Sequence, residues 1–134
     1  MIPRIHVAAA VILATDQRIL IARRPEHKHL GGLWEFPGGK VEPGETAAVA
    51  LHRELHEELA ILVQSAEPFL EVQHDYADKA VLLDVWWVRR FSGQPKGNEG
   101  QPLQWVTVAE LPDYSFPAAN QPIIDALQSA LQPD

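Results

Sequence analysis

The chain has 134 residues, 46% of them apolar, which suits one globular domain and leaves no room for two. Its net charge of −7, from 11 basic and 18 acidic residues, argues against binding to a nucleic-acid polymer, which needs clustered lysines and arginines. The sequence has no cysteine, which excludes disulfides, a cysteine nucleophile and a thiolate metal site. No apolar run reaches the ~18 residues of a membrane-spanning helix, so no membrane association is expected. We expect residues 1–134 to form a single domain.

The predicted elements follow one another without a repeat or a linker. In chain order they are strands over residues 5–13 and 18–23, a short extended segment over 40–42, a helix beginning at Thr46, strands over 69–76, 80–91 and 103–106, and a helix over 120–131. The first strand is interpreted as buried rather than as a signal peptide, because His6 interrupts its apolar run. Asp16 and Gln17 predict a hairpin turn that pairs the first two strands. Mixed strands with two helices predict an α+β sandwich, with helices on the two faces of a mixed sheet.

The helix that begins at Thr46 has two chemically different faces. Its apolar stripe follows spacings of three and four residues and consists of Ala47, Ala50, Leu51, Leu55 and Leu59. Glu54, Glu57 and Glu58 stand at i, i+3 and i+4, so their side chains share another face. Like charges at this spacing destabilise a helix slightly, and a bound cation would remove that cost.

Three carboxylates beside a glycine turn suit magnesium, which is usually held by a few carboxylates together with substrate phosphates. The backbone carbonyl of Gly38 or Gly39 is a further candidate ligand, because a glycine lets the main chain approach an ion. The alternative is a solvated acidic face on an ordinary amphipathic helix. Arg53 follows Glu45 by eight residues and precedes Glu57 by four. Arg53 and Glu45 are therefore expected to tie the preceding loop to the helix and to aim the other carboxylates.

From Gly39 to Ile61 the sequence resembles the signature of the Nudix hydrolase family. The positions that match are Gly39, Glu45, Arg53, Glu54, Leu55, Glu57, Glu58 and Ile61. Ala60 stands where the signature has a glycine, which removes no ligand but is expected to tighten or redirect the turn that leaves the helix. The resemblance implies an α/β/α sandwich and a hydrolase in which water attacks a phosphorus of a nucleoside diphosphate derivative while divalent ions organise the phosphates.

The resemblance also implies a cofactor and the roles of individual residues. Mg²⁺ is the expected cation, with Mn²⁺ as a substitute. Glu54 and Glu58 are the first candidates for its ligands, Glu57 is a ligand directly or through water, and Gly38 supplies a carbonyl. The three glutamates are also the expected catalytic residues. The residues implied to be structural parts of the motif are Gly39, Glu45 and Arg53.

Outside this motif the chain is similar, over nearly its whole length, to the MutT-type 8-oxo-dGTP diphosphatases within the family. The similarity rests on residues 23–24, 33–40, 97–102 and 116–120. It implies that Glu99 reaches the metals, as a ligand and a catalytic residue, whereas the alternative is an acidic residue on a surface loop. Either Glu54 or Glu99 is then the general base that takes the proton from water.

Asn120 has two interpretations. Asparagine is a good N-cap for the last predicted helix. In the other interpretation, its side chain recognises the base. Guanine presents two acceptors, N7 and O6, and oxidation at C8 places a hydrogen on N7. An asparagine amide, with one acceptor and one donor, matches only the oxidised edge, and a buried mismatch costs ~1–3 kcal/mol.

Four other residues are candidates for substrate binding, each with an ordinary structural role as the alternative. Arg24 is a candidate for a phosphate contact. Phe36, together with Tyr76, either lines the base pocket or belongs to the core. Asp78, next to Lys79, either folds over the pocket or forms a hairpin turn. His29 is a loop residue that is expected to approach the ligand.

These residues together predict hydrolysis of 8-oxo-dGTP to 8-oxo-dGMP and pyrophosphate, which sanitises the nucleotide pool, prevents mutation and so supports DNA repair. One alternative is another Nudix substrate, such as CTP, a modified pyrimidine triphosphate or a dinucleoside polyphosphate. Another is a nucleotide sensor without catalysis, which would be expected to lose carboxylates that this chain keeps. We expect a cytoplasmic monomer whose partner is a small nucleotide.

Overall fold

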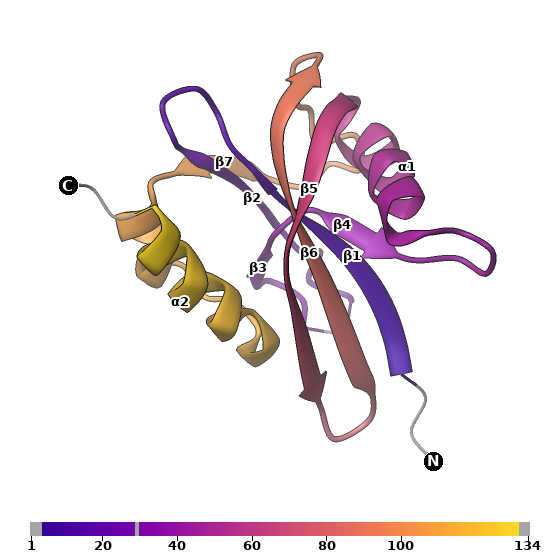
Figure 1. Ribbon diagram of the computed structural model, residues 1–134. Coiled ribbons are helices and arrows are strands. Elements are labelled where there is room, and N and C mark those ends of the chain that lie inside the picture. Colours follow the sequence, from indigo (N-terminus) through magenta and orange to yellow (C-terminus); the bar gives the residue numbers. More distant parts are fainter. Residues whose placement is uncertain (1–3, 29, 132–134) are drawn as a thin grey trace.

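Two β-sheets form the middle layer of the molecule, with α1 on one side and α2 on the other (Figure 1). The computed structural model describes residues 4–28 and 30–131, so His29 lies outside the described residues. The strands are β1 (Arg4–Ile12), β2 (Ile19–Arg23), β3 (Trp34–Glu35), β4 (Gly38–Lys40), β5 (Leu62–Asp75), β6 (Ala80–Ser92) and β7 (Leu103–Val106). The helices are α1 (Ala47–Leu59), α2 (Gln121–Ala130) and two 3-10 turns, η1 (Val108–Asp113) and η2 (Ala118–Asn120). The predicted α+β sandwich, with helices on both faces of the strands, is confirmed.

The strands form two sheets rather than the one that was expected. The larger sheet has the order β4-β1-β6-β5 and is mixed, because β1 and β6 are parallel and the other pairs are antiparallel. The smaller sheet has the order β3-β2-β7 and is antiparallel. The other strands were predicted, but β3 was missed, the segment predicted over 40–42 is the strand β4 at Gly38–Lys40, and the division between two sheets was not visible in the sequence.

The prediction that the first two strands pair as a hairpin is wrong, although the predicted turn between them is present. The turn exists, since the Ala14 N–H donates to the Arg18 carbonyl at 2.9 Å, but β1 and β2 share only the bridge between Leu13 and Ile19. From there β1 pairs with β4 and β6, whereas β2 pairs with β3 and β7. The second half of β1 and all of β2 except Arg23 are buried, and each strand lies inside its own sheet with a neighbour on either side.

The strand predicted over residues 69–76 begins seven residues earlier, at Leu62, and ends at Asp75. Its first half contains polar side chains and Pro68, which do not have the pattern of a buried strand. β5 lies at the edge of the larger sheet, where such residues are tolerated, and its register against β6 shifts near Val63, Ser65 and Pro68.

The helix α1 has the start and the apolar face that were predicted. The Thr46 hydroxyl accepts a hydrogen bond from the Val49 N–H at 3.2 Å and caps the helix. The buried residues of its apolar face are Ala50, Leu51, Leu55 and Leu59. They form one core cluster with Ala8, Ala10 and Ile12 of β1, so this face of α1 packs against the larger sheet.

A second core cluster fills the opposite face of the larger sheet, under α2. Ile123, Ile124 and Leu127 of α2 pack there against apolar residues of the strands. Strand β6 contributes Val85 and Trp87 to this cluster and Val88 to the other, which confirms that both its faces are covered. Among the described residues, no helix has the length and apolar character that a membrane span requires.

Candidate active site

The acidic face of α1 borders a cavity of about 290 Å³. Glu54 and Glu58 of α1 meet Glu35 of β3 and Glu99 of the loop before β7 in its lining. The same lining contains four basic residues, Arg23, Arg24, Lys28 and Lys40. Carboxylates and cationic side chains thus surround one polar space, which we call the acidic cavity.

Two carboxylates of the acidic cavity, those of Glu58 and Glu35, have pKa values above the ordinary value of glutamate. Burial, together with the nearby negative charges of Glu54, Glu35 and Glu99, raises the pKa of Glu58 to about 9. Burial also raises the pKa of Glu35, against the opposing effect of Arg24, whose Nη1 lies 2.9 Å from the Glu35 carboxylate. Such a cluster binds either protons or a cation, because several buried negative charges are unfavourable together.

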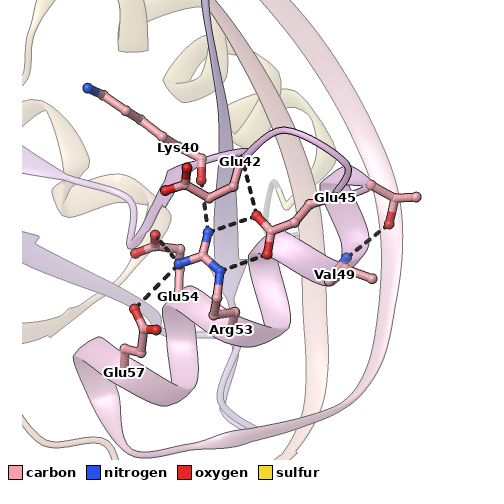
Figure 2. Close-up of polar contacts among 8 residues, drawn as sticks. Lys40, Glu42, Glu45, Val49, Arg53, Glu54 and Glu57 are labelled. Carbon is pink, nitrogen blue, oxygen red and sulfur yellow. Dashed lines mark hydrogen bonds and ion pairs between the residues drawn. The ribbon is translucent and has the colours of Figure 1, made fainter.

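Arg53 organises the loop that precedes α1, as Figure 2 shows. Its Nε and Nη2 donate to the two oxygens of Glu45 at 2.7 and 2.9 Å, a bidentate pair. Its Nη1 donates to Glu54 at 2.8 Å and to Glu57 at 3.4 Å, and Nη2 also donates to the Lys40 carbonyl at 3.1 Å. One guanidinium therefore joins the loop, the end of β4 and the acidic face of the helix.

Glu45 is charged throughout the neutral range. The hydrogen bonds from Arg53 lower its pKa to about 2, and the Glu42 N–H, 2.9 Å from Glu45 Oε1, acts in the same direction. A carboxylate held this way is an anchor rather than a proton carrier.

Gly38 and Gly39 let β4 approach its neighbours closely. In the register of β4 with β1, Gly39 lies opposite Ala8 and Gly38 opposite Ala9. A side-chain carbon on Gly38 would overlap the Ala8 carbonyl oxygen, and one on Gly39 would overlap the Glu54 carboxylate. The Glu54 carboxylate thus lies directly against the Gly39 backbone, in space that only a glycine leaves open.

Glu99 is placed by hydrogen bonds between its loop and the end of α1. The N–H groups of Lys96 and Asn98 donate to the carbonyls of Leu59 and Glu58 at 2.9 and 3.0 Å. The Gln101 side chain donates to the Glu58 carbonyl at 3.2 Å and accepts from the Glu99 N–H at 2.9 Å. These contacts satisfy helix carbonyls that have no partner within α1, and they bring Glu99 to the acidic cavity.

A second cavity, of about 220 Å³, adjoins the first and shares Arg24, Glu35, Gly38, Gly39 and Lys40 with it. Its remaining lining is mostly apolar or aromatic: Ile5, Val7, Ala9, Leu30, Phe36, Tyr76, Lys79, Val81, Leu83, Pro117, Ala119 and Asn120. We call this space the apolar cavity. Its size and its position beside the carboxylates suit a flat ring whose charged part extends into the acidic cavity.

Asn120 is the polar residue buried at the end of this apolar cavity, with 9% of its surface exposed. It occupies the N-cap position of α2, but its side chain makes no capping hydrogen bond. Its backbone continues the 3-10 turn η2, and its N–H donates to the Pro117 carbonyl at 3.0 Å. The amide is therefore not used for capping, although capping was one of its two interpretations.

The other residues singled out in the sequence lie in different surroundings. Phe36 is 4% exposed and stacks on Phe116, with ring centres 5.3 Å apart. Glu57 is largely exposed and is not part of the lining of either cavity. Asp78 is exposed at the β5–β6 turn and is also outside both linings.

Sequence reasoning missed Glu35 and Gln101. Glu35 is the acidic residue of the two-residue strand β3, and its position between Trp34 and Phe36 was the available signal. In a strand, its side chain points to the face opposite that of both aromatic neighbours. Gln101 had no local signal, because its partner, the Glu58 carbonyl, is 43 positions away in the chain.

The donor set fits a divalent cation in its chemistry. Carboxylates of Glu54, Glu58 and Glu99 surround a cavity in which their crowding already raises the pKa of Glu58. Within residues 4–28 and 30–131, however, no three acidic or histidine side chains stand close enough together to hold a metal as arranged.

Comparison with known proteins finds relatives that match nearly the whole chain and solved structures with the same fold. A model of the NUDIX domain matches residues 8–126. The 8-oxo-dGTP diphosphatase of Escherichia coli K12 is 38% identical over 125 residues, which cover 93% of this chain and 97% of that protein. The CTP pyrophosphohydrolase of the same organism is also 38% identical over 125 residues, covering 93% and 92%. A solved MutT structure, from work on Aliivibrio salmonicida and Vibrio cholerae, has a TM-score of 0.83 and 43% identity, with 96% and 99% of the two chains covered.

Proposed function

This chain belongs to the NUDIX domain family, and we propose that it hydrolyses 8-oxo-dGTP to 8-oxo-dGMP and pyrophosphate with a divalent cation as cofactor. The observation that carries the choice of base is Asn120, a buried residue that lines the apolar cavity and whose side chain makes no capping hydrogen bond to α2. The observation that supports cleavage between phosphates is the acidic cavity next to it.

The residues proposed to hold the cation are Glu54 and Glu58, with Glu99 and the Gly38 carbonyl, and Glu57 directly or through water. Mg²⁺, or Mn²⁺ in its place, supplies charge neutralisation of the phosphates and favours ionisation of the attacking water. Glu54 or Glu99 takes the proton of that water at a carboxylate oxygen.

The basic rim of the acidic cavity is proposed to bind the phosphates. Arg24 lines both cavities, so it is suitably placed to contact a phosphate that extends from a base in the apolar cavity. Arg53 and Glu45 are proposed as positioning residues, because they contact the loop and Glu54 rather than the cavity itself.

Base selection follows from hydrogen-bond complementarity. The oxidised guanine edge offers a donor at N7 and an acceptor at O6, and the Asn120 amide offers one acceptor and one donor. Normal guanine has no donor on this edge and would leave the Asn120 side-chain oxygen unpaired in an apolar cavity, which weakens binding by roughly five- to hundredfold. Phe36 is proposed to border the ring of the base. Asp78 is proposed to fold over the pocket, and His29 is proposed to approach the ligand.

A turnover assay with Mg²⁺ tests the proposal. Rates on 8-oxo-dGTP, dGTP, CTP and a dinucleoside polyphosphate are compared at substrate concentrations below KM, with pyrophosphate as the measured product. We expect 8-oxo-dGTP to be hydrolysed fastest and the Glu54→Gln variant to lose most activity while its circular dichroism spectrum is unchanged. Equal values of kcat/KM for dGTP and 8-oxo-dGTP would refute base selection by Asn120.

CTP is the second candidate substrate, since a CTP pyrophosphohydrolase resembles the chain as closely in identity as the 8-oxo-dGTP diphosphatase does. A higher kcat/KM for CTP in the same assay would favour it. Binding of nucleotides without turnover would instead indicate a sensor. Under the main proposal the protein acts as a cytoplasmic monomer on free nucleotides and thereby suppresses mutation.

A further inference from the structure

Tyr76 contacts the turn that carries Asn120. Tyr76 follows β5 directly and belongs to the turn toward β6, where its N–H donates to the Lys79 carbonyl at 2.8 Å. Its side-chain hydroxyl accepts a hydrogen bond from the Ala119 N–H at 3.1 Å. The donor and the acceptor are 43 positions apart in the chain, and the residue that follows Ala119 is Asn120.

The Ala119 N–H needs this acceptor. Ala119 is the second residue of the 3-10 turn η2, and the first N–H groups of a helix have no carbonyl partner within it. Ala119 is only 3% exposed, so water has little access to its backbone. Without the Tyr76 hydroxyl, a buried donor would lose its hydrogen bond, and the turn would be free to move to satisfy it.

Other contacts hold the two ends of the segment from residue 115 to residue 121, which contains the turn η2. Phe116 stacks on Phe36 with an angle of 21° between the rings, and the Trp34 N–H donates to the Ser115 carbonyl at 2.8 Å. On the other side, the helix α2 begins at Gln121. The hydroxyl of Tyr76 therefore contacts the middle of the segment, immediately before Asn120, which lines the apolar cavity.

We propose that Tyr76 is a positioning residue for base selection, whose hydroxyl holds the turn Ala118–Asn120 so that the Asn120 amide meets the edge of the base. This inference rests on the proposed function of Asn120. The phosphates and the attacking water are handled in the acidic cavity, which Tyr76 does not line. Loss of the hydroxyl therefore affects recognition of the base and leaves the chemical step intact.

The test uses Tyr76→Phe, which removes the hydroxyl and keeps the ring. The chain has two tyrosines, and Tyr114→Phe is the matched control. The Tyr114 ring packs edge-on against Trp34, and its hydroxyl makes no hydrogen bond to any of the residues that the structure describes. We expect Tyr76→Phe to lower the ratio of kcat/KM for 8-oxo-dGTP over dGTP by roughly three- to tenfold. The loss appears in KM for 8-oxo-dGTP, with kcat unchanged, and Tyr114→Phe keeps the wild-type ratio.

A double variant tests whether Tyr76 acts through Asn120. Asn120→Ala removes the recognising amide, so the combination with Tyr76→Phe is expected to be no less selective than Asn120→Ala alone. Amide hydrogen exchange supplies a readout that needs no substrate: exchange at Ala119 is expected to be faster in Tyr76→Phe than in the wild type or in Tyr114→Phe.

The outcomes separate this inference from the proposed function. Unchanged exchange at Ala119 in Tyr76→Phe overturns the inference. Faster exchange with unchanged selectivity, while Asn120→Ala loses selectivity, also overturns it and leaves the proposed function intact. A wild-type protein without preference for 8-oxo-dGTP refutes the proposed function itself, and the role of Tyr76 with it.

Discussion

Arg53 donates two hydrogen bonds, of 2.7 and 2.9 Å, to the two oxygens of Glu45, and a third, of 2.8 Å, to Glu54. The loop before α1 and the first proposed cation ligand are thus held by the same guanidinium (Figure 2). A lysine has no planar fork and cannot reproduce this set of donors. The orientation of the Glu54 carboxylate therefore depends on the identity of residue 53 as well as on its charge.

The first prediction concerns Arg53→Lys. We expect activity to fall by roughly ten- to hundredfold, because partners that orient metal ligands typically contribute this much. Steady-state kinetics over a range of Mg²⁺ concentrations is the measurement. Arg18→Lys is the control, since Arg18 pairs with Asp16 at an exposed turn. Wild-type kinetics in Arg53→Lys would show that charge alone suffices at this position.

The second prediction concerns the pH dependence of stability in the presence of a chelator. The folded-state pKa of Glu58 is about 9, above its ordinary value of 4.5, so the folded protein binds this proton more tightly than the unfolded chain does. The resulting stabilisation is fully present below pH 4.5 and is lost as the pH rises to about 9. The Tm is therefore expected to fall over this interval, and less steeply in Glu58→Gln.

Thermal unfolding followed by circular dichroism at a series of pH values measures this effect. Glu71→Gln is the control, because Glu71 is exposed on the edge strand β5 and is expected to keep the wild-type profile. Addition of Mg²⁺ at alkaline pH is expected to raise the Tm of the wild type, since a cation that binds only the folded state stabilises it. Parallel profiles for Glu58→Gln and the wild type would contradict the assigned pKa shift.

The third prediction concerns Ala60, which replaces the glycine of the family motif. Ala60 ends α1 with φ 60° and ψ 30°, the left-handed conformation, and its N–H donates to the His56 carbonyl at 3.0 Å. The exit turn therefore has the ordinary left-handed form and is not redirected, but alanine is strained in it. Ala60→Gly is expected to raise the free energy of unfolding by about 1 kcal/mol without changing kcat.

Urea unfolding of Ala60→Gly is compared with that of Ala126→Gly. Ala126 lies in the interior of α2, where glycine is expected to lower the free energy of unfolding by about 1 kcal/mol. If both variants were destabilised equally, strain at Ala60 would be absent.

The fourth prediction concerns Gln101, which connects the Glu99 loop to α1. Gln101→Ala removes the bond to the Glu58 carbonyl and the one from the Glu99 N–H. We expect kcat to fall roughly tenfold while the Tm changes little, because the bonds orient Glu99 but bury no apolar surface. Gln94→Ala, at an exposed position of the same connection, is the control. An unchanged kcat would show that Glu99 does not depend on Gln101.

Features that depend on neighbouring residues could be predicted from the sequence. The start of α1 at Thr46, its apolar face and its acidic face all follow from spacings of three and four residues within one helix. The bidentate contact of Arg53 with Glu45 spans only eight positions, and the family motif already implied it. The acidic side of the candidate site was therefore visible before the fold was known.

Features that depend on distant pairing could not be predicted. The turn at Asp16 and Gln17 links β1 to β2, but β1 pairs with β4 and β6 in one sheet, whereas β2 pairs with β3 and β7 in the other. Pro68 and its polar neighbours concealed the first half of β5, because only its position at a sheet edge permits them. For the same reason the contact of Tyr76 with Ala119 required the three-dimensional structure.

The two interpretations of Asn120, as a cap of α2 and as the residue that recognises the base, lead to different expected results. Asn120 lines the apolar cavity, and its side chain makes no capping bond. Asn120→Ala is therefore expected to weaken binding of the oxidised base without unfolding α2, as judged by circular dichroism. A loss of helix content would instead support the capping interpretation.

The measurement that tests the central claim most directly is equilibrium binding of the two products, 8-oxo-dGMP and dGMP, by titration calorimetry. It requires no turnover and isolates recognition of the base. The wild type is expected to bind 8-oxo-dGMP at least about tenfold more tightly than dGMP, and Asn120→Ala is expected to bind the two with similar affinity. A preference for 8-oxo-dGMP that persists unchanged in a folded Asn120→Ala variant would contradict the claim that Asn120 selects the oxidised base.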